Sequence, residues 1–246
     1  MIKKILLLFM FMITSLLADA AIDYKATAFK LYINGKMNQW QSLIDKMNSD
    51  VNFKTTDDKL EILNYYYGLV GHLIDKKEKD EASKCLTKAM KLADELYIKN
   101  PDNAVLLGLI SNLTGFQIAL SPIKATVLAK GMLSKSKKSY ALAPGNPEVI
   151  ILHSNIQLYM PEIFGGDKQK ALSGYKKALK IMELNPKYMK NNWMYIQLLT
   201  SIGLVEEKLN NLEAAKAAYK KILDMYPDYA HVRDIMYPRL LERMKS

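Results

Sequence analysis

The residues that could carry out chemistry are few and scattered along the chain. The three histidines, His72, His153 and His231, lie far apart, and none stands in a metal-binding spacing such as H-E-x-x-H. The single cysteine, Cys85, belongs to a helix-period apolar stripe, which favours a packed core residue over a nucleophile. No G-x-S-x-G, S-x-x-K or phosphate-binding loop occurs. The sequence therefore predicts no enzyme, no catalytic residue, no metal site and no cofactor.

The composition limits the classes of protein to which this chain can belong. The chain has 246 residues, of which 50% are hydrophobic and 24% are charged. It is long enough for a sizeable core and too apolar to be disordered. One cysteine excludes an intramolecular disulfide, a zinc-thiolate cluster and an iron–sulfur site. The formal net charge of +10 raises nucleic acid or an anionic membrane as a partner.

Residues 1–20 have the features of a secretory signal peptide. Lys3 and Lys4 precede an apolar stretch at 5–17, and Ala18-Asp19-Ala20 is a small-x-small cleavage site. A helix over 5–17 would span about 20 Å, short of the roughly 30 Å hydrocarbon core of a bilayer. We expect cleavage after Ala20 and export to a bacterial periplasm, with residues 21–246 as one mature domain. Retention of the segment as a membrane anchor is the alternative.

A repeat of about forty residues organises the rest of the chain. Its marks are Pro101, Pro147, Pro186 and Pro227, which are spaced by 46, 39 and 41 residues. Each proline follows one helical segment and opens another, because proline is tolerated in the first turn of a helix. Strand-like alternation is almost absent and the loops are short. The sequence predicts a series of helix pairs, closed by a capping helix over 230–245.

The last helix pair, 197–210 and 212–225, carries the most specific pattern. Its marker residues are Leu199, Ile202, Gly203, Ala215, Tyr219, Ile222 and Pro227. This spacing resembles the tetratricopeptide repeat (TPR), in which small residues let two helices approach and an aromatic side chain fills the gap to the next unit. Glu206 departs from the family, which favours Tyr there, and Ile222 stands in place of the usual Ala.

The resemblance covers most of residues 24–245, strongly over 188–229 and weakly over 103–145. It implies an all-α fold, a right-handed superhelical solenoid of about five antiparallel helix pairs plus a C-terminal capping helix. In such a fold the stacked units present a long surface rather than one rigid pocket.

The turn over 160–167 is longer than the others. Pro161 ends the preceding helix, glycines at 165 and 166 permit positive φ, and Asp167 can cap the next helix. The segment from Phe164 to Asp167 resembles a turn of exported bacterial helical-repeat proteins associated with TRAP-type transporters. Two interpretations stay open. The segment is a capped inter-helix turn, or exposed Ile163 and Phe164 form a docking knob.

The TPR resemblance also implies a partner-binding groove lined by the first helix of each pair. The groove residues carried over from the family are Tyr65, His72, Asn112, Asn155, Gln197, Thr200 and Glu207, with Leu69, Val105, Leu109, Glu148, Ile151, Leu158 and Leu204 beside them. This mixed set has little positive charge, which suits a peptide or protein segment.

We therefore expect an exported, non-enzymatic module that binds a protein or peptide partner in the cell envelope. The alternative is a small-ligand-binding or accessory component of an envelope transport system, which the TRAP-like turn suggests. An open polar groove would favour the first, and an enclosed apolar pocket the second.

The basic surplus does not indicate nucleic acid. The only arginines are Arg233, Arg239 and Arg243, so 32 of the 35 basic residues are lysines. Lysine supplies point charge but not the bidentate base contacts that arginine makes. We expect a solvated lysine surface and no nucleic-acid partner, while weak peripheral attraction to an anionic membrane or an acidic partner stays open.

Overall fold

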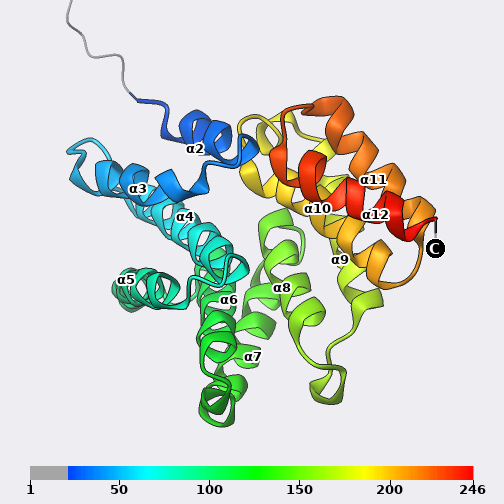
Figure 1. The fold of residues 1–246 in the computed structure, drawn as a ribbon. Coiled ribbons are helices and arrows are strands. Elements are labelled where there is room, and N and C mark those ends of the chain that lie inside the picture. Colours follow the sequence, from blue (N-terminus) through cyan, green and yellow to red (C-terminus); the bar gives the residue numbers. More distant parts are fainter. Residues whose placement is uncertain (1–21, 246) are drawn as a thin grey trace, which may run out of the picture.

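A computed structural model describes residues 22–245 of the chain, and over this range it contains helices and turns but no β-strand (Figure 1). The α-helices are α2 (Tyr24–Ile33), α3 (Trp40–Ser49), α4 (Thr56–Asp75), α5 (Lys79–Lys99), α6 (Ala104–Leu120), α7 (Ala125–Leu142), α8 (Pro147–Tyr159), α9 (Lys168–Glu183), α10 (Trp193–Lys208), α11 (Leu212–Met225) and α12 (Tyr237–Arg243). The short helices are η1 (Met37–Gln39), η2 (Pro122–Lys124), η3 (Glu162–Phe164), η4 (Pro186–Tyr188) and the π-helical η5 (Val232–Met236).

The proposed signal peptide and its cleavage site lie outside the described residues. Within the described range, no helix combines the length and the apolar character that crossing a membrane requires.

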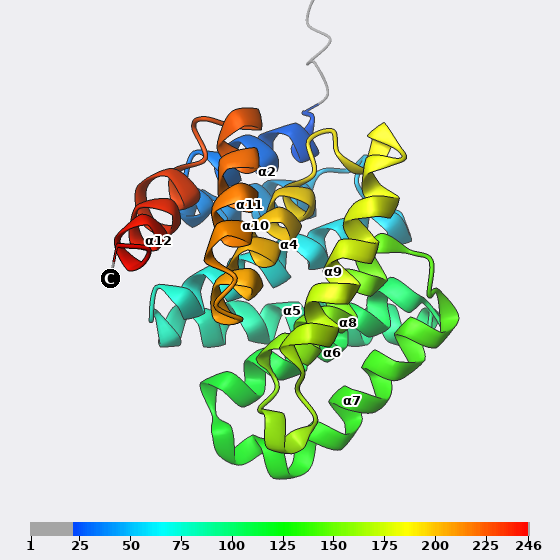
Figure 2. The ribbon, with the colours of Figure 1, turned by 90° about the vertical axis from the view of Figure 1, so that its right-hand side faces the viewer.

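Successive helices pack as five pairs, α2 with α3 through α10 with α11, and α12 packs on α11. The first helices α4, α6, α8 and α10 contact one another in turn and form an inner layer, while α5, α7, α9 and α11 lie outside them (Figures 1 and 2). The predicted all-α solenoid of five helix pairs with a C-terminal helix is confirmed.

Side-chain caps determine where several helices begin. The Asn146 side chain accepts a hydrogen bond from the backbone N–H of Glu148 at 2.9 Å, and Pro147 occupies the first turn of α8. Asp167 accepts from the backbone N–H of Lys170 at 3.0 Å, which confirms its predicted capping role. Each such cap stabilises a helix by about 1 kcal/mol, because it satisfies an N–H that has no partner within the helix.

Gly203 and Tyr219 explain the close packing of α10 on α11. A Cβ atom added at Gly203 would lie 2.3 Å from Cε1 of Tyr219, so a side chain at this position would displace the ring. Tyr219 is fully buried. The ring was expected to fill the gap to the next unit, but it packs on the glycine of its own pair. The reason is that the glycine leaves a hollow directly opposite the ring.

The N-terminal helix α2 packs against the last helix pair, which closes the solenoid (Figure 1). The Tyr229 hydroxyl donates to the Tyr32 hydroxyl at 2.8 Å, and Tyr32 donates to Oε1 of Gln197 at 2.6 Å. The ring of Trp193 at the start of α10 lies 5.3 Å from that of Trp40. Chain segments separated by 197 residues are thus joined by a buried hydrogen bond.

Candidate partner-binding site

The predicted groove residues lie on first helices, as expected, but most of them are bonded inside the protein. Asn112 is 6% exposed, and its Nδ2 donates to the carbonyl of Leu152 at 2.9 Å, which ties α6 to α8. The Asn155 side chain donates to the Tyr67 hydroxyl at 2.8 Å and accepts from the Tyr175 hydroxyl at 2.6 Å. These two amides hold helices together and leave little surface for a partner.

Three further groove residues also have internal hydrogen-bond partners, two of them within their own helix. The buried Tyr65 hydroxyl donates to Glu61 at 2.6 Å, and buried Thr200 donates to the carbonyl of Ile196 at 2.8 Å. Gln197 is the acceptor of the closing hydrogen bond from Tyr32. Their polar groups are therefore satisfied without any ligand.

Glu207 anchors the C-terminal helix. Its buried carboxylate accepts from Nη2 of Arg239 at 3.0 Å and from the Tyr219 hydroxyl at 3.3 Å. Its backbone carbonyl accepts from Nη1 of Arg243 at 3.0 Å. The two arginines come from α12, so this residue joins α10 to the capping helix.

The neighbouring carboxylate, Glu206, faces α9. It accepts from Lys176 at 2.7 Å and from the Asn211 side chain at 2.8 Å. Burial by itself raises the pKa of Glu206, but the hydrogen bonds from Lys176 and Asn211 outweigh it and leave this pKa below its ordinary value. The charged form of Glu206 is thus favoured in the folded protein.

His72 belongs to a group of titratable residues from distant parts of the chain. We call this group the central cluster, and its members are His72 and Asp75 of α4, Tyr159 at the end of α8, His231 before η5, and Arg239 of α12. His231 lies within electrostatic reach of Asp75, His72 and Arg239, and Tyr159 within reach of Asp75. The fold thus brings positions 72 and 231 within electrostatic reach of each other.

The central cluster combines neutral imidazoles with an accessible phenol. Burial is the main cause that lowers the pKa of His72 and of His231, while Asp75 acts in the opposite sense on both. Both imidazoles are therefore mostly uncharged at pH 7. Tyr159 is 64% exposed, yet the protein around its hydroxyl and the charge of Asp75 raise its pKa. The imidazoles and the phenol can donate or accept hydrogen bonds, and their rings can stack on a ligand.

The third histidine does not join the cluster. His153 shares a hydrogen bond of 2.8 Å between its Nδ1 and the Ser136 hydroxyl, and its ring stacks on Tyr140 at 4.8 Å. It therefore faces α7. Over residues 22–245, no three His, Cys, Asp or Glu side chains are placed to hold a metal ion.

The long turn between α8 and α9 encloses a recess of about 360 Å³, lined in part by Leu158, Met160 and Ile163. Gly165 adopts a φ of +98°, as predicted, whereas at Gly166 an added Cβ would lie 1.8 Å from the carbonyl oxygen of Met160. Two apolar side chains project from this turn, because Ile163 is 85% and Phe164 is 67% exposed. Whether they dock on a partner stays a prediction.

Sequence reasoning missed Asp75, Tyr159 and His231 as site residues. Each stands at or beyond a helix end, where no groove position of the family falls. The signal that could have pointed to them was their type, since a histidine, an aspartate and a tyrosine at helix ends are candidates for contact with a ligand. Their electrostatic coupling joins residues far apart in the sequence, which no local motif indicates.

Comparison with known proteins agrees with this architecture. The tetratricopeptide repeat family matches residues 196–229, which include most of α10 and all of α11. The haemophore HusA from Porphyromonas gingivalis has a similar structure, with a TM-score of 0.56 and 16% identity over 75% of this chain and 90% of that one. A thermophilic TPR protein of Thermus thermophilus is similar with a TM-score of 0.53 and 14% identity, over 89% of this chain and 98% of that one.

No curated protein sequence matches the chain. The family match and the structural likeness show that the fold is that of a TPR-like helical-repeat protein. Folds of this class generally serve as non-catalytic scaffolds for protein–protein interaction.

Proposed function

We propose that the chain is an exported helical-repeat protein that binds a protein or peptide partner without catalysis. The observation that carries this proposal is the central cluster. It brings an acidic, a basic, an imidazole and a phenol group within electrostatic reach of His231 or Asp75, at the ends of α4 and α8. The first-helix positions expected from the family are mostly occupied by internal hydrogen bonds. The partner surface proposed here is therefore displaced from those positions toward the central cluster.

The chemistry of the cluster suits a short polypeptide segment. Asp75 is exposed and can accept from a lysine, an arginine or a backbone N–H of the partner. Tyr159 offers an exposed ring for packing as well as a hydroxyl. The uncharged imidazoles of His72 and His231 add donors and acceptors without strong charge, so both polar and apolar groups of a peptide can be matched.

A crosslinked pull-down from the bacterial envelope tests this surface. We expect the mature chain, residues 21–246, to capture a specific protein, and the double variant Asp75→Ala/Tyr159→Ala to lose at least about 90% of it, since two contacts worth about 1 kcal/mol each are removed. Val51→Ser is the matched control, because Val51 is 80% exposed in the loop before α4. Equal capture by both variants would exclude the cluster as the binding surface.

Export has its own test. Fractionation of the producing cells should place a chain that begins at Ala21 in the envelope fraction. A full-length product in the cytosol would overturn the proposed export and leave the binding function to be judged by the pull-down alone.

A second candidate function is transport of a small ligand, with haem as the specific case. It is favoured by the likeness to the haemophore HusA and by the residue types of the central cluster. Histidine and tyrosine are both side chains that ligate haem iron. His72, His231 and the exposed Tyr159 would be the residues of this chain that approach such a ligand.

Titration of the purified mature chain with haemin separates the two functions. A carrier should give a saturable shift of the Soret band whose affinity is weakened at least about tenfold in His72→Ala/His231→Ala, because the two imidazoles would be the ligands of the haem iron. His153→Ala is the control, since His153 faces α7. If no saturable shift is seen, haem is excluded as the carried ligand and the protein-binding proposal is unaffected.

A further inference from the structure

The outer helix of the third pair carries an accessible basic surface that the proposed function does not use. Residues 121–146 hold five lysines and no Asp or Glu. These lysines are Lys124, Lys130, Lys135, Lys137 and Lys138. In α7 the buried residues are Met132, Ser136 and Ser139, so most of this helix faces solvent.

Two apolar side chains project from the beginning of this basic segment. Ile123 is 81% and Val127 is 79% exposed, and they are four residues apart, which places them on one side of a helical turn. Lys130 continues the same side one turn later and is exposed as well. Exposed apolar side chains can enter the interfacial layer of a bilayer while neighbouring lysines contact anionic headgroups.

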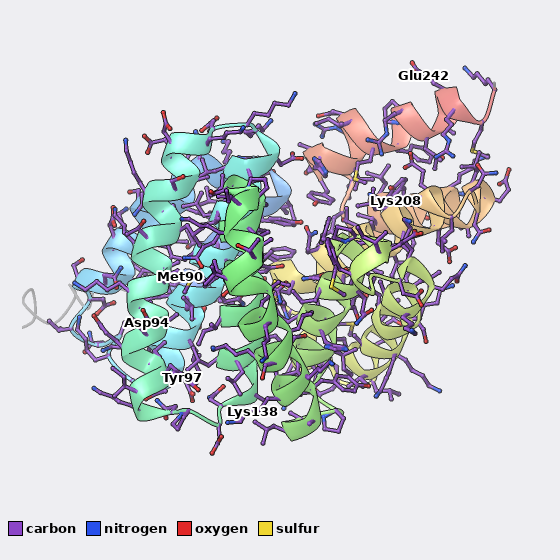
Figure 3. The ribbon with its side chains drawn as sticks, turned by 90° about the horizontal axis from the view of Figure 1, so that it is seen from below. Met90, Asp94, Tyr97, Lys138, Lys208 and Glu242 are labelled. Carbon is purple, nitrogen blue, oxygen red and sulfur yellow. The ribbon has the colours of Figure 1, made fainter. Side chains whose placement is uncertain are left out.

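Two of these lysines contact α5 or the turn that follows it, and the other three make no such contact. Lys138 pairs with Asp102 at 2.6 Å, and the Lys135 ammonium lies 5.7 Å from the centre of the Tyr97 ring. Figure 3 shows Tyr97 and Lys138 close together on the α5 side of α7. Lys124 and Lys130 have exposed side chains and lie on the N-terminal half of the segment, beside the apolar pair.

The exposed turn between α8 and α9 reaches the same end of the molecule as η2 and the start of α7, as the two views of Figures 1 and 2 agree. Ile163 and Phe164 project from this turn. The turn is held in shape, because the Gly166 N–H donates to the Pro161 carbonyl at 3.1 Å and the Asp167 N–H to the Gln157 carbonyl at 2.9 Å. Its own charges pair with one another, Lys168 with Glu162 and Lys170 with Asp167.

We propose that this end of the molecule docks on an anionic lipid surface. The docking end consists of Ile123, Val127, Ile163 and Phe164 together with the flanking Lys124 and Lys130. Four large apolar side chains on two separate projections can enter the interfacial layer of a bilayer together, and the lysines match the charge of anionic headgroups. Residues 121–146 carry lysines and no acid, and this positive charge favours anionic lipid over neutral lipid.

Two other strongly exposed apolar residues lie outside the lysine-rich segment 121–146. Ile98 is 81% exposed at the end of α5, and Leu184 is 78% exposed after α9. Acidic residues lie near both, Asp102 after Ile98 and Glu183 before Leu184. These two positions therefore provide a control of similar exposure at a distance in sequence from the lysine-rich segment.

Co-sedimentation with vesicles tests the docking end. Residues 21–246 are used, which form the mature chain of the proposed function. We expect binding to phosphatidylcholine vesicles that contain phosphatidylglycerol, little binding to phosphatidylcholine alone, and a loss of about tenfold or more in high salt. Ile123→Ser/Phe164→Ser should weaken binding about tenfold, while Ile98→Ser/Leu184→Ser should bind like the unmodified chain.

A charge variant completes the experiment. Lys124→Gln/Lys130→Gln should also weaken binding to anionic vesicles, and circular dichroism should show unchanged helix content in all variants. No binding to anionic vesicles, or equal weakening by both apolar double variants, would overturn the proposal. It would also be overturned if Ile123→Ser/Phe164→Ser abolished capture of a soluble protein and left vesicle binding intact.

Discussion

The helix pairs α10–α11 and α6–α7 hold their outer helices in different ways. The buried residues of α11 are Ala215, Tyr219 and Ile222, so this helix is fixed by an aromatic ring and an isoleucine. The buried residues of α7 are Met132, Ser136 and Ser139. Ser139 donates to the Ala104 carbonyl at 2.6 Å, so hydroxyl groups replace much of the apolar packing there.

The inner helices of the two pairs, α10 and α6, also differ in how many of their residues are buried. In α10, 13 of the 16 residues are buried, against 9 of 17 in α6. Of these two pairs, the one that matches the TPR family therefore buries more of its inner helix, and the divergent pair leaves more of its surface exposed. Divergence from the family thus coincides with accessible surface, which is where a function specific to this chain can lie.

The largest contrast is expected from the same substitution in both pairs. Gly203→Val should lower the free energy of unfolding by about 3 kcal/mol, because the new side chain overlaps the buried Tyr219 ring. Gly131→Val in α7 should change it by less than about 0.5 kcal/mol, since no atom lies within 4 Å of an added Cβ. Denaturant unfolding measures both. Similar losses at the two sites would contradict the difference in packing.

A smaller contrast is expected between two carboxylates. Glu207→Ala should cost about 2 kcal/mol, because it leaves the buried Tyr219 hydroxyl and Arg239 without their acceptor. Asp102→Ala removes only the ion pair with Lys138, in which the Asp102 side chain is 72% exposed, and should cost less than about 0.5 kcal/mol. Thermal unfolding of both variants measures the two losses of stability. A larger loss for Asp102→Ala would mean that α7 depends on its surface charge.

The smallest contrast concerns pH. The folded pKa of Glu206 lies below its ordinary 4.5, so the stability that its hydrogen bonds add is present above pH 4.5 and is lost as pH falls through the folded pKa. Glu206→Gln should lower the free energy of unfolding by at most about 1 kcal/mol at pH 7, because Lys176 is largely exposed. The difference from the unmodified chain should shrink below pH 4.5.

Lys130→Gln is the control for this titration. No carboxyl group occurs between residues 103 and 146, so the effect of this change on unfolding should stay constant between pH 4 and pH 7, to within about 0.3 kcal/mol. A pH-dependent effect at Lys130 comparable to that at Glu206 would contradict the assignment of the pH dependence to the Glu206 carboxyl.

Helix pairs and turns could be predicted from sequence because their causes are local. The helix over 212–225 was placed with the bounds that the structure shows, and Asp167 caps α9 as its type and position indicate. The preceding helix was expected from 197 but begins at Trp193. The Asn192 side chain accepts from the Met194 N–H at 3.0 Å and starts the helix one turn earlier.

The site was less predictable because it depends on contacts between distant segments. The position of Asn155 on a first helix follows from the repeat, but its two tyrosine partners, Tyr67 and Tyr175, come from α4 and α9. Repeat spacing alone cannot show that the amide is already satisfied. Likewise, nothing near His231 in the sequence indicates that His72 and Asp75 of α4 will come within electrostatic reach of it.

The closure at Tyr32 has a consequence for how this protein can change over evolution. Open solenoids gain or lose whole repeats, because each unit contacts only its neighbours. Here an inserted unit of about forty residues would carry Tyr229 and Gln197 away from Tyr32 and uncover Trp193. The number of repeats is thus fixed by the contact between the two ends, and variation is confined to loops and outer faces.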